Sequence, residues 1–385
     1  MPKKTTVIMG LVLFSIVSYG QTWWLEGAFP DDSGWPQSVG QGLAIDGEGK
    51  IWYEPHYASE TMFVDGFGDK DCRAIYVFNP DGSPASFSPI KSIAISGLID
   101  TLWGQNRGLR TDPNGDIIAA SDSVYFRINH ETGMGLQKLV PYSEDVALTT
   151  PAFDQNGNMF TCTVYGGYPI KIFDSNWELI QEAIPAEMHN DWSRTIEVEP
   201  NGSSIYYFNV APGIGVIRFN SSDNTVNGDY TSTIDTLFKE LQVEAATWDK
   251  TGKLWMGNDA GIGFANTAVF AYDPNTESFV DSIIFDTELE KPRSFDFNAD
   301  ESLAYFTFYD DNHAIYKYSK VRPSHTWHIS SAGSDATGDG SISNPLATIQ
   351  FGINAAVDGD TVLVQPGTYV DCILSEQLRA NSMIF

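Results

Sequence analysis

Apolar and polar positions repeat along the middle of this chain. A short apolar run, a turn of the form Asp-x-x-Gly and a second β-rich run appear first as Leu43–Ile45, Asp46-Gly47-Glu48-Gly49 and Ile51-Trp52. The same pattern returns with turns beginning at Asp112, Asp154, Glu199, Asp249 and, in degenerate form, Asn298. Asp, Asn and Gly tolerate the left-handed backbone of a tight hairpin, so each copy predicts two antiparallel strands joined by such a turn.

A second alternating pattern follows each turn and predicts a third strand that ends at an Asx residue or nearby. Its six copies cover residues 75–79, 124–129, 170–174, 216–220, 269–273 and 315–318. Most units add a fourth strand, such as Ser278–Phe285. Four antiparallel strands in each of six units predict an all-β fold, a six-bladed β-propeller over residues 21–320.

The sixth unit lacks its outer strand, because the chain turns at Val321-Arg322-Pro323. Thr22–Phe29 precedes the first repeat and has the composition of a strand. We expect it to complete the last blade, which joins the two ends of the propeller and removes open sheet edges. The extra residues between the first two turns predict a long loop around Met62 to Cys72.

These paired motifs resemble the six-bladed propellers of the NHL and SMP-30/gluconolactonase kind. The resemblance implies architecture more than activity, because this fold serves lactonases, lyases, sensors and binding scaffolds alike. In the gluconolactonase type, the residue at the channel entry of each innermost strand supplies carboxylate and amide ligands to a divalent metal. The corresponding residues, five before each turn, are here Gln41, Arg107, Thr149, Arg194, Glu244 and Arg293.

Only Glu244 suits a cation, and guanidinium groups repel metal ions. We therefore expect no metal and no other cofactor in the channel. The three arginines indicate an anion site for a carboxylate or sulfate. The alternative is that they pair with Glu244 and with channel acids such as Glu197 or Asp296.

Two polar loops fall near the same face, one with His189 and Asp191 and one with Asp310 and His313. A histidine beside carboxylates suits acid–base chemistry of the kind used by propeller lyases. Asp, Asn and His are also ordinary loop residues, so we assign none of them a catalytic role and treat them as accessory candidates.

The first 20 residues have the pattern of a cleaved export signal. Lys3 and Lys4 precede the apolar run Val7–Val17, and Ser18-Tyr19-Gly20 is a small-x-small cleavage site. This run is too short to span a bilayer, as is every later one. We therefore expect a secreted, periplasmic or cell-surface protein.

The chain carries 22 basic and 50 acidic residues, a net charge of −28. Such a charge excludes nucleic acid and anionic lipid as partners and keeps an extracellular protein soluble. Its three cysteines, Cys72, Cys162 and Cys372, are far apart and match no metal spacing, so the fold does not depend on disulfides.

The pattern changes after a linker at residues 321–326. Residues 327–385 predict a strand, a polar loop, a helix with Ile349, Ile353 and Val357 on one face, and a buried strand. This segment resembles the start of secreted pectate-lyase-like right-handed β-helix domains, most specifically at Gly359–Tyr369. The resemblance implies a capping helix and a first coil, with catalytic residues on later coils. We therefore expect a truncated module that folds poorly or self-associates.

The function that these features favour is an extracellular binding or scaffold propeller joined to a carbohydrate-associated β-helix module. Its ligand would be an extracellular polysaccharide or a small anion. The alternative is an enzyme, either a lyase or hydrolase acting at the channel mouth or a polysaccharide lyase in a longer parent protein.

Overall fold

The computed structural model describes residues 22–30, 39–102, 104–143, 145–189, 192–211, 213–239, 241–258, 268–285, 292–309, 315–322, 324–357, 359–369 and 382–384. The chain divides into two compact units, residues 1–320 and residues 321–385. Residues 1–20, where the export signal is predicted, lie outside the described residues. Within the described part, no helix combines the length and apolar character needed to cross a bilayer.

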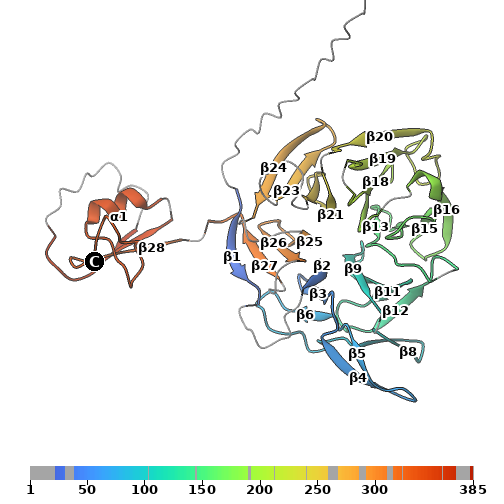
Figure 1. Ribbon diagram of the computed structural model, residues 1–385, viewed down its shortest axis with the longest axis horizontal. Helices are drawn as coiled ribbons and strands as arrows, with labels where there is room; N and C mark the ends of the chain where they lie inside the picture. The colour runs from blue at the N-terminus through green and yellow to red at the C-terminus, as the bar shows by residue number, and fades with distance from the viewer. Residues whose placement is uncertain are drawn as a thin grey trace, which may run out of the picture. The chain divides into compact units, whose positions relative to one another are not determined.

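The first unit is a ring of six antiparallel sheets, which confirms the predicted six-bladed β-propeller (Figure 1). The first blade contains β2 (Gly40–Ile45), β3 (Ile51–Pro55) and β6 (Tyr76–Phe78). The second contains β9 (Asn106–Thr111), β10 (Ile117–Ser121), β11 (Val124–Ile128) and β12 (Gly135–Leu139). The third contains β13 (Ala152–Phe153), β14 (Met159–Thr161), β15 (Ile170–Phe173) and β16 (Leu179–Ile184). The fourth contains β17 (Ile196–Val198), β18 (Ser204–Phe208), β19 (Val216–Asn220) and β20 (Thr233–Leu237). The fifth contains β21 (Val243–Trp248), β22 (Leu254–Asn258), β23 (Ala268–Asp273) and β24 (Ser278–Ile284). The last contains β25 (Pro292–Phe297), β26 (Leu303–Phe308), β27 (Tyr316–Ser319) and β1 (Trp24–Ala28).

The N-terminal strand closes the ring, as predicted. Strand β1 pairs antiparallel with β27, with Trp24 opposite Ser319 and Ala28 opposite Tyr316. The last blade therefore contains segments from both ends of the propeller unit. This pairing covers an edge of β27 that would otherwise present free backbone donors and acceptors.

The repeated turns have the predicted geometry. Asp46 Oδ1 accepts the backbone N–H groups of Glu48 and Lys50, both at 2.9 Å, and Oδ2 accepts the Trp52 indole N–H at 2.8 Å. The residue three positions after the start of each turn has a positive φ, at Gly49, Gly115, Gly157, Gly202, Gly252 and Glu301. One aspartate therefore fixes both a turn and the tryptophan of the following strand.

The segment expected to be a long loop around Met62 to Cys72 is instead a β-hairpin of β4 (Glu60–Val64) and β5 (Gly68–Cys72). Burial alternates along β4 because one face covers the protein while the other is exposed. A second hairpin joins β7 (Ser92–Ile95) and β8 (Leu98–Thr101). Cys72 and Cys162 are buried free thiols, and Cys372 lies outside the described residues.

The second unit contains the parallel strands β28 (Thr326–Ile329), β29 (Thr361–Val364) and β30 (Ser382–Ile384), in that order. Helix α1 (Ile349–Ala355) begins at Thr348, whose side chain accepts the Phe351 N–H at 3.3 Å. Its small core consists of Ile329, Leu346, Ile349, Ile353, Val362 and Val364. Val357 does not share the buried helix face that was expected, because the helix ends before it and its side chain is 46% exposed.

Candidate functional site

The innermost strands begin at one end of the central channel, here called the mouth. The six predicted ring residues lie at or just before the start of these strands, and Arg293 and Glu244 make the closest contact among them. Arg293 Nη1 donates to Glu244 Oε2, and Arg194 Nε lies 3.8 Å from the same oxygen. Arg293 and Glu244 are buried, with 7% and 9% of their surfaces exposed. The alternative that the arginines pair with a channel acid therefore holds for Arg293 and, at a longer distance, for Arg194.

Arg107 is placed differently, because its Nη2 donates to the neutral side chain of Gln105 at 2.5 Å. The Nε–H groups of Arg107, Arg194 and Arg293 are all buried without a hydrogen-bond acceptor among the described residues. A buried donor left unpaired costs about 1–3 kcal/mol, more when it is charged. The mouth therefore holds three guanidinium groups whose hydrogen-bonding capacity the described residues do not fully use.

The pKa of His56 is lowered in part by the positive charge of the mouth. Burial, and then the charges of Arg293, Arg194, Arg73 and Arg107, lower the pKa of His56 from 6.5 to about 4. The imidazole is therefore neutral at pH 7, and its Nδ1 donates to Gln41 Oε1 at 2.9 Å. Because a glutamine oxygen only accepts, this contact places the proton on Nδ1.

Besides Glu244, a carboxyl group near the mouth, that of Glu54, is largely uncharged at pH 7. Glu54 is fully buried on β3, and its Oε1 accepts the Gly108 N–H at 2.7 Å. Burial raises the pKa of Glu54 to about 8, while that hydrogen bond and the charge of Arg107 oppose the rise. Glu54 is therefore largely protonated at pH 7, so it does not neutralise the arginines.

Aromatic side chains surround the arginines. The guanidinium of Arg293 lies 4.3 Å from the centre of the Tyr309 ring, and that of Arg194 lies 4.9 Å from Trp192. Trp192 in turn stacks on Tyr165, with ring centres 6.0 Å apart and planes 20° from parallel. Cation–π contacts of this kind orient arginines while leaving their N–H edges available.

Arg110 closes the channel beneath the mouth. Its guanidinium donates to the Pro151 carbonyl at 3.1 Å, the Ala246 carbonyl at 3.2 Å and Glu197 Oε1 at 2.5 Å. Burial raises the pKa of Glu197 to about 7, with Arg110 opposing the rise. The cavity left between Arg110 and the Arg293–Glu244 pair is about 20 Å³, room for about one water molecule. This cavity therefore has no room for a ligand larger than water.

The remaining predicted site residues have other positions. Thr149 is fully buried and its hydroxyl donates to the Cys162 carbonyl at 3.3 Å. His189 is 1% exposed and packs on Tyr207 with ring centres 5.3 Å apart, and burial lowers its pKa. It is a packing residue here, without access to a ligand. Asp191, Asp310 and His313 lie outside the described residues.

Sequence reasoning missed His56, Arg73 and Tyr165. They lie in loops outside the repeating register, so alignment of the six turns gave no signal for them. Arg73 donates to the carbonyls of His56 and Gly104 at 3.0 and 2.9 Å, which fixes it beside the histidine. We call Arg73, Arg107, Arg194, Arg293, Glu244 and His56 together the mouth site.

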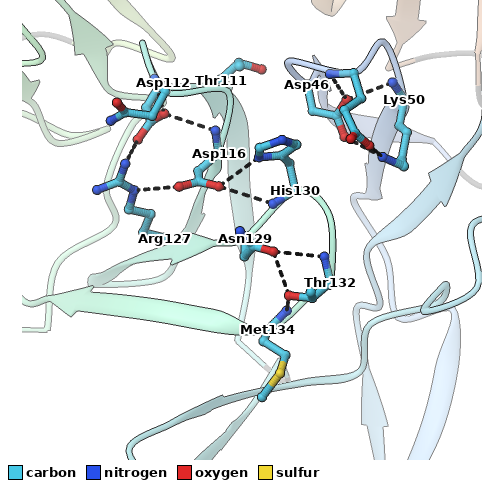
Figure 2. A network of polar contacts seen from close by, with 12 residues as sticks. Asp46, Lys50, Thr111, Asp112, Asp116, Arg127, Asn129, His130, Thr132 and Met134 are labelled. Carbon is cyan, nitrogen blue, oxygen red and sulfur yellow. Dashed lines mark hydrogen bonds and ion pairs between the residues drawn. The ribbon is translucent and has the colours of Figure 1, made fainter.

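A second polar cluster lies at the opposite end of the blades, among the turns (Figure 2). Arg127 pairs with Asp112 and Asp116, and Asp116 also contacts His130 Nδ1 at 2.9 Å. His130, Glu48 and Glu131 bring three possible metal ligands within 4.8 Å of one another. However, Lys50 already pairs with Glu48, and Glu48 and Glu131 are exposed. We therefore regard this cluster as the charged packing of neighbouring turns.

The fold defines the class of protein: a six-bladed β-propeller with structural neighbours of the SMP-30/gluconolactonase kind. A calcium-binding regucalcin from Agrobacterium tumefaciens has a TM-score of 0.50 and 13% identity, covering 77% of this chain and 93% of its own. A gluconolactonase from Xanthomonas campestris has a TM-score of 0.50 and 11% sequence identity, covering 74% of this chain and 87% of its own. A luciferin-regenerating enzyme has a TM-score of 0.50 and 11% identity, covering 76% of this chain and 92% of its own. No protein-family model and no curated protein sequence matches the chain.

The mouth does not fit the divalent metal that a gluconolactonase-like resemblance implies. Glu244 is the one carboxylate of the predicted ring, and its Oε2 is already bonded to Arg293 and close to Arg194. A cation there would face the four arginines that depress the pKa of His56. The donors of this site are N–H groups, which bind anions and not metals.

Proposed function

We propose that this protein is a secreted binding propeller whose mouth holds a small anionic ligand through a carboxylate or sulfate group. The observation that carries the proposal is the set of four arginines around His56, three of them with a buried Nε–H that lacks an acceptor among the described residues. Charge-assisted hydrogen bonds from guanidinium are the strongest and most directional contacts available to such groups. The chain as a whole has a net charge of −28 and repels anions, so an anion binds preferentially at this local positive site.

Binding is favoured over catalysis by the state of the acid–base groups near the mouth. Glu54 is fully buried, His189 is 1% exposed, and the His56 proton is held on Nδ1 by Gln41. A general acid or base must reach the substrate within hydrogen-bond distance. Among the described residues, Glu54 and His189 do not meet that condition. His56 has an Nε2 that can accept a proton, but its pKa of about 4 makes it a weak base at pH 7.

The second unit is proposed to be the start of a right-handed β-helix. Three features support this: the parallel ladder β28–β29–β30, helix α1 packed on its first two strands, and the parallel bridge between Ile329 and Leu346. Parallel stacking of successive strands is the repeat of a solenoid, and a helix at one end is a usual cap. The propeller and this module together would form an extracellular, carbohydrate-associated protein.

Isothermal titration of the full chain with sulfate and with glucuronate tests the anion site. Arg107→Gln is the informative variant because it removes a guanidinium without leaving a buried carboxylate unpaired, and we expect roughly tenfold weaker binding. Arg218→Gln is the matched control, since Arg218 on β19 pairs with Asp235 on β20, outside the mouth. Binding should also weaken as salt is raised. Equal affinity in wild type and Arg107→Gln would refute the proposal.

A further inference from the structure

Tyr165 and Trp192 form an aromatic platform at the rim of the mouth. They come from different blades, Tyr165 after β14 and Trp192 before β17, yet their rings stack with centres 6.0 Å apart. Tyr165 is 65% exposed and Trp192 is 45% exposed. Two large aromatic rings held parallel and left open to solvent gain little from burial, so their packing alone does not explain this arrangement.

The platform is joined to the anion site through Arg194. Its guanidinium carbon lies 4.9 Å from the centre of the Trp192 ring, which orders arginine, tryptophan and tyrosine in contact. Tyr165 also lies in the neighbourhood of Arg107 and Arg194. A ligand that contacts the platform is therefore within reach of the guanidinium donors.

A hollow of about 380 Å³ adjoins the platform on the side of the second and third blades. Its lining includes Tyr165, Tyr168, Asp122 and Asp145. This volume falls in the range of about 300–1,000 Å³ that is usual for small-molecule sites. The two carboxylates accept hydrogen bonds and repel anions, so the part of a ligand that enters the hollow must carry donors, such as hydroxyl groups, and no negative charge.

We infer that the ligand is an acidic oligosaccharide that spans these three places. Its terminal acidic sugar directs a carboxylate to Arg107 and Arg194, the C–H face of that sugar stacks on the exposed side of the Tyr165–Trp192 pair, and a neutral sugar places its hydroxyls at Asp122 and Asp145. This inference rests on the proposed function, because it takes the anion site as given. A polyanion such as a nucleic acid does not fit, since the two aspartates would meet further negative charge.

Four probes separate the contributions in isothermal titrations of the full chain. These are glucuronosyl-glucose, its neutral analogue cellobiose, glucuronate, and sulfate as an anion without a ring. We expect the affinity to decrease from glucuronosyl-glucose to glucuronate to sulfate, with cellobiose weaker than glucuronosyl-glucose by at least tenfold. Trp192→Ala and Tyr165→Ala should each weaken the binding of glucuronosyl-glucose roughly tenfold. Both should weaken sulfate binding less than this, and Tyr165→Ala least, because Trp192 also packs on Arg194.

Two further variants serve as controls for loss of structure and for the general effect of removing an exposed aromatic ring. Trp192→Phe keeps an aromatic face and should restore most of the affinity, which a general loss of structure would not allow. Phe63→Ala is the matched control, because Phe63 is 66% exposed on the β4–β5 hairpin. If sulfate and both acidic sugars bind equally and Trp192→Ala has no effect, the oligosaccharide inference is wrong while the anion site stands. If cellobiose binds as tightly as the acidic disaccharide and Arg107→Gln has no effect, the anion site itself is refuted.

Discussion

Replacing Glu244 with glutamine distinguishes an anion site from a metal site, because the two predict different changes in the affinity for sulfate. The side chains of Arg293 and Glu244 are 6% and 10% exposed, and Arg194 lies 3.8 Å from the same carboxylate oxygen. Glu244→Gln removes the negative charge that compensates two guanidinium groups while keeping an oxygen that accepts one hydrogen bond. Breaking a buried ion pair costs about 3–5 kcal/mol, so we expect a loss of about 3 kcal/mol in the free energy of unfolding.

The same substitution should strengthen anion binding. Glu244 competes with a bound anion for Arg293, and its removal makes at least one charge-assisted hydrogen bond available to the ligand. Such a bond contributes about 1.5–3 kcal/mol, which predicts at least a tenfold gain in sulfate affinity. A metal site predicts the reverse, since removal of its one ring carboxylate would weaken binding of the cation and leave sulfate unaffected.

Urea unfolding followed by tryptophan fluorescence measures the first effect, and calorimetric titration with sulfate measures the second. Asp100→Asn is the control because Asp100 pairs with Lys138 at the surface, and the two side chains are 36% and 37% exposed. An exposed pair contributes about 0–1 kcal/mol. The reasoning fails if Glu244→Gln is as stable as Asp100→Asn, or if it lowers sulfate affinity.

Three other predictions concern protonation, the turns and the second unit. Because burial raises the pKa of Glu54 from 4.5 to about 8, the folded state holds a proton that the unfolded state releases, so this group's contribution to stability should fall as pH rises from about 4.5 to 8. Glu54→Gln should flatten that part of the curve of unfolding free energy against pH, and an unchanged slope would contradict it. Asp249→Ala removes acceptors for the N–H groups of Thr251 and Lys253 and for the Trp255 indole, and should cost about 3 kcal/mol of unfolding free energy, whereas Asp300→Ala at the degenerate turn should cost less. Limited trypsin digestion should cut near residues 320–326 and leave a monomeric propeller, as detected by mass spectrometry and gel filtration. A second unit that resists the protease as well as the blades do, in a monomer, would mean that it is a stable folded domain and would contradict this prediction.

The sequence by itself determined the six blades, their turns and the closing strand. Each of these depends on residues a few positions apart, since strand alternation places side chains on one face and an Asp with a Gly three positions later completes one turn. The register of the repeats also placed Arg107, Arg194 and Arg293 at one end of the channel. Closure of the ring by Thr22–Phe29 was predictable, because the last repeat lacks its outer strand and this segment is a strand without a repeat of its own.

The tertiary structure decided what that ring of residues can do. His56, Arg73 and Tyr165 join the mouth from loops outside the repeat, so the register gave no indication of them. The charge state of a group depends on every neighbour within a few ångströms, and the pKa of His56 is set by burial and by arginines between 17 and 237 positions away in sequence. Burial likewise turned His189 into a packing residue and left Glu54 uncharged. These outcomes depend on packing between distant segments, which local sequence patterns do not specify.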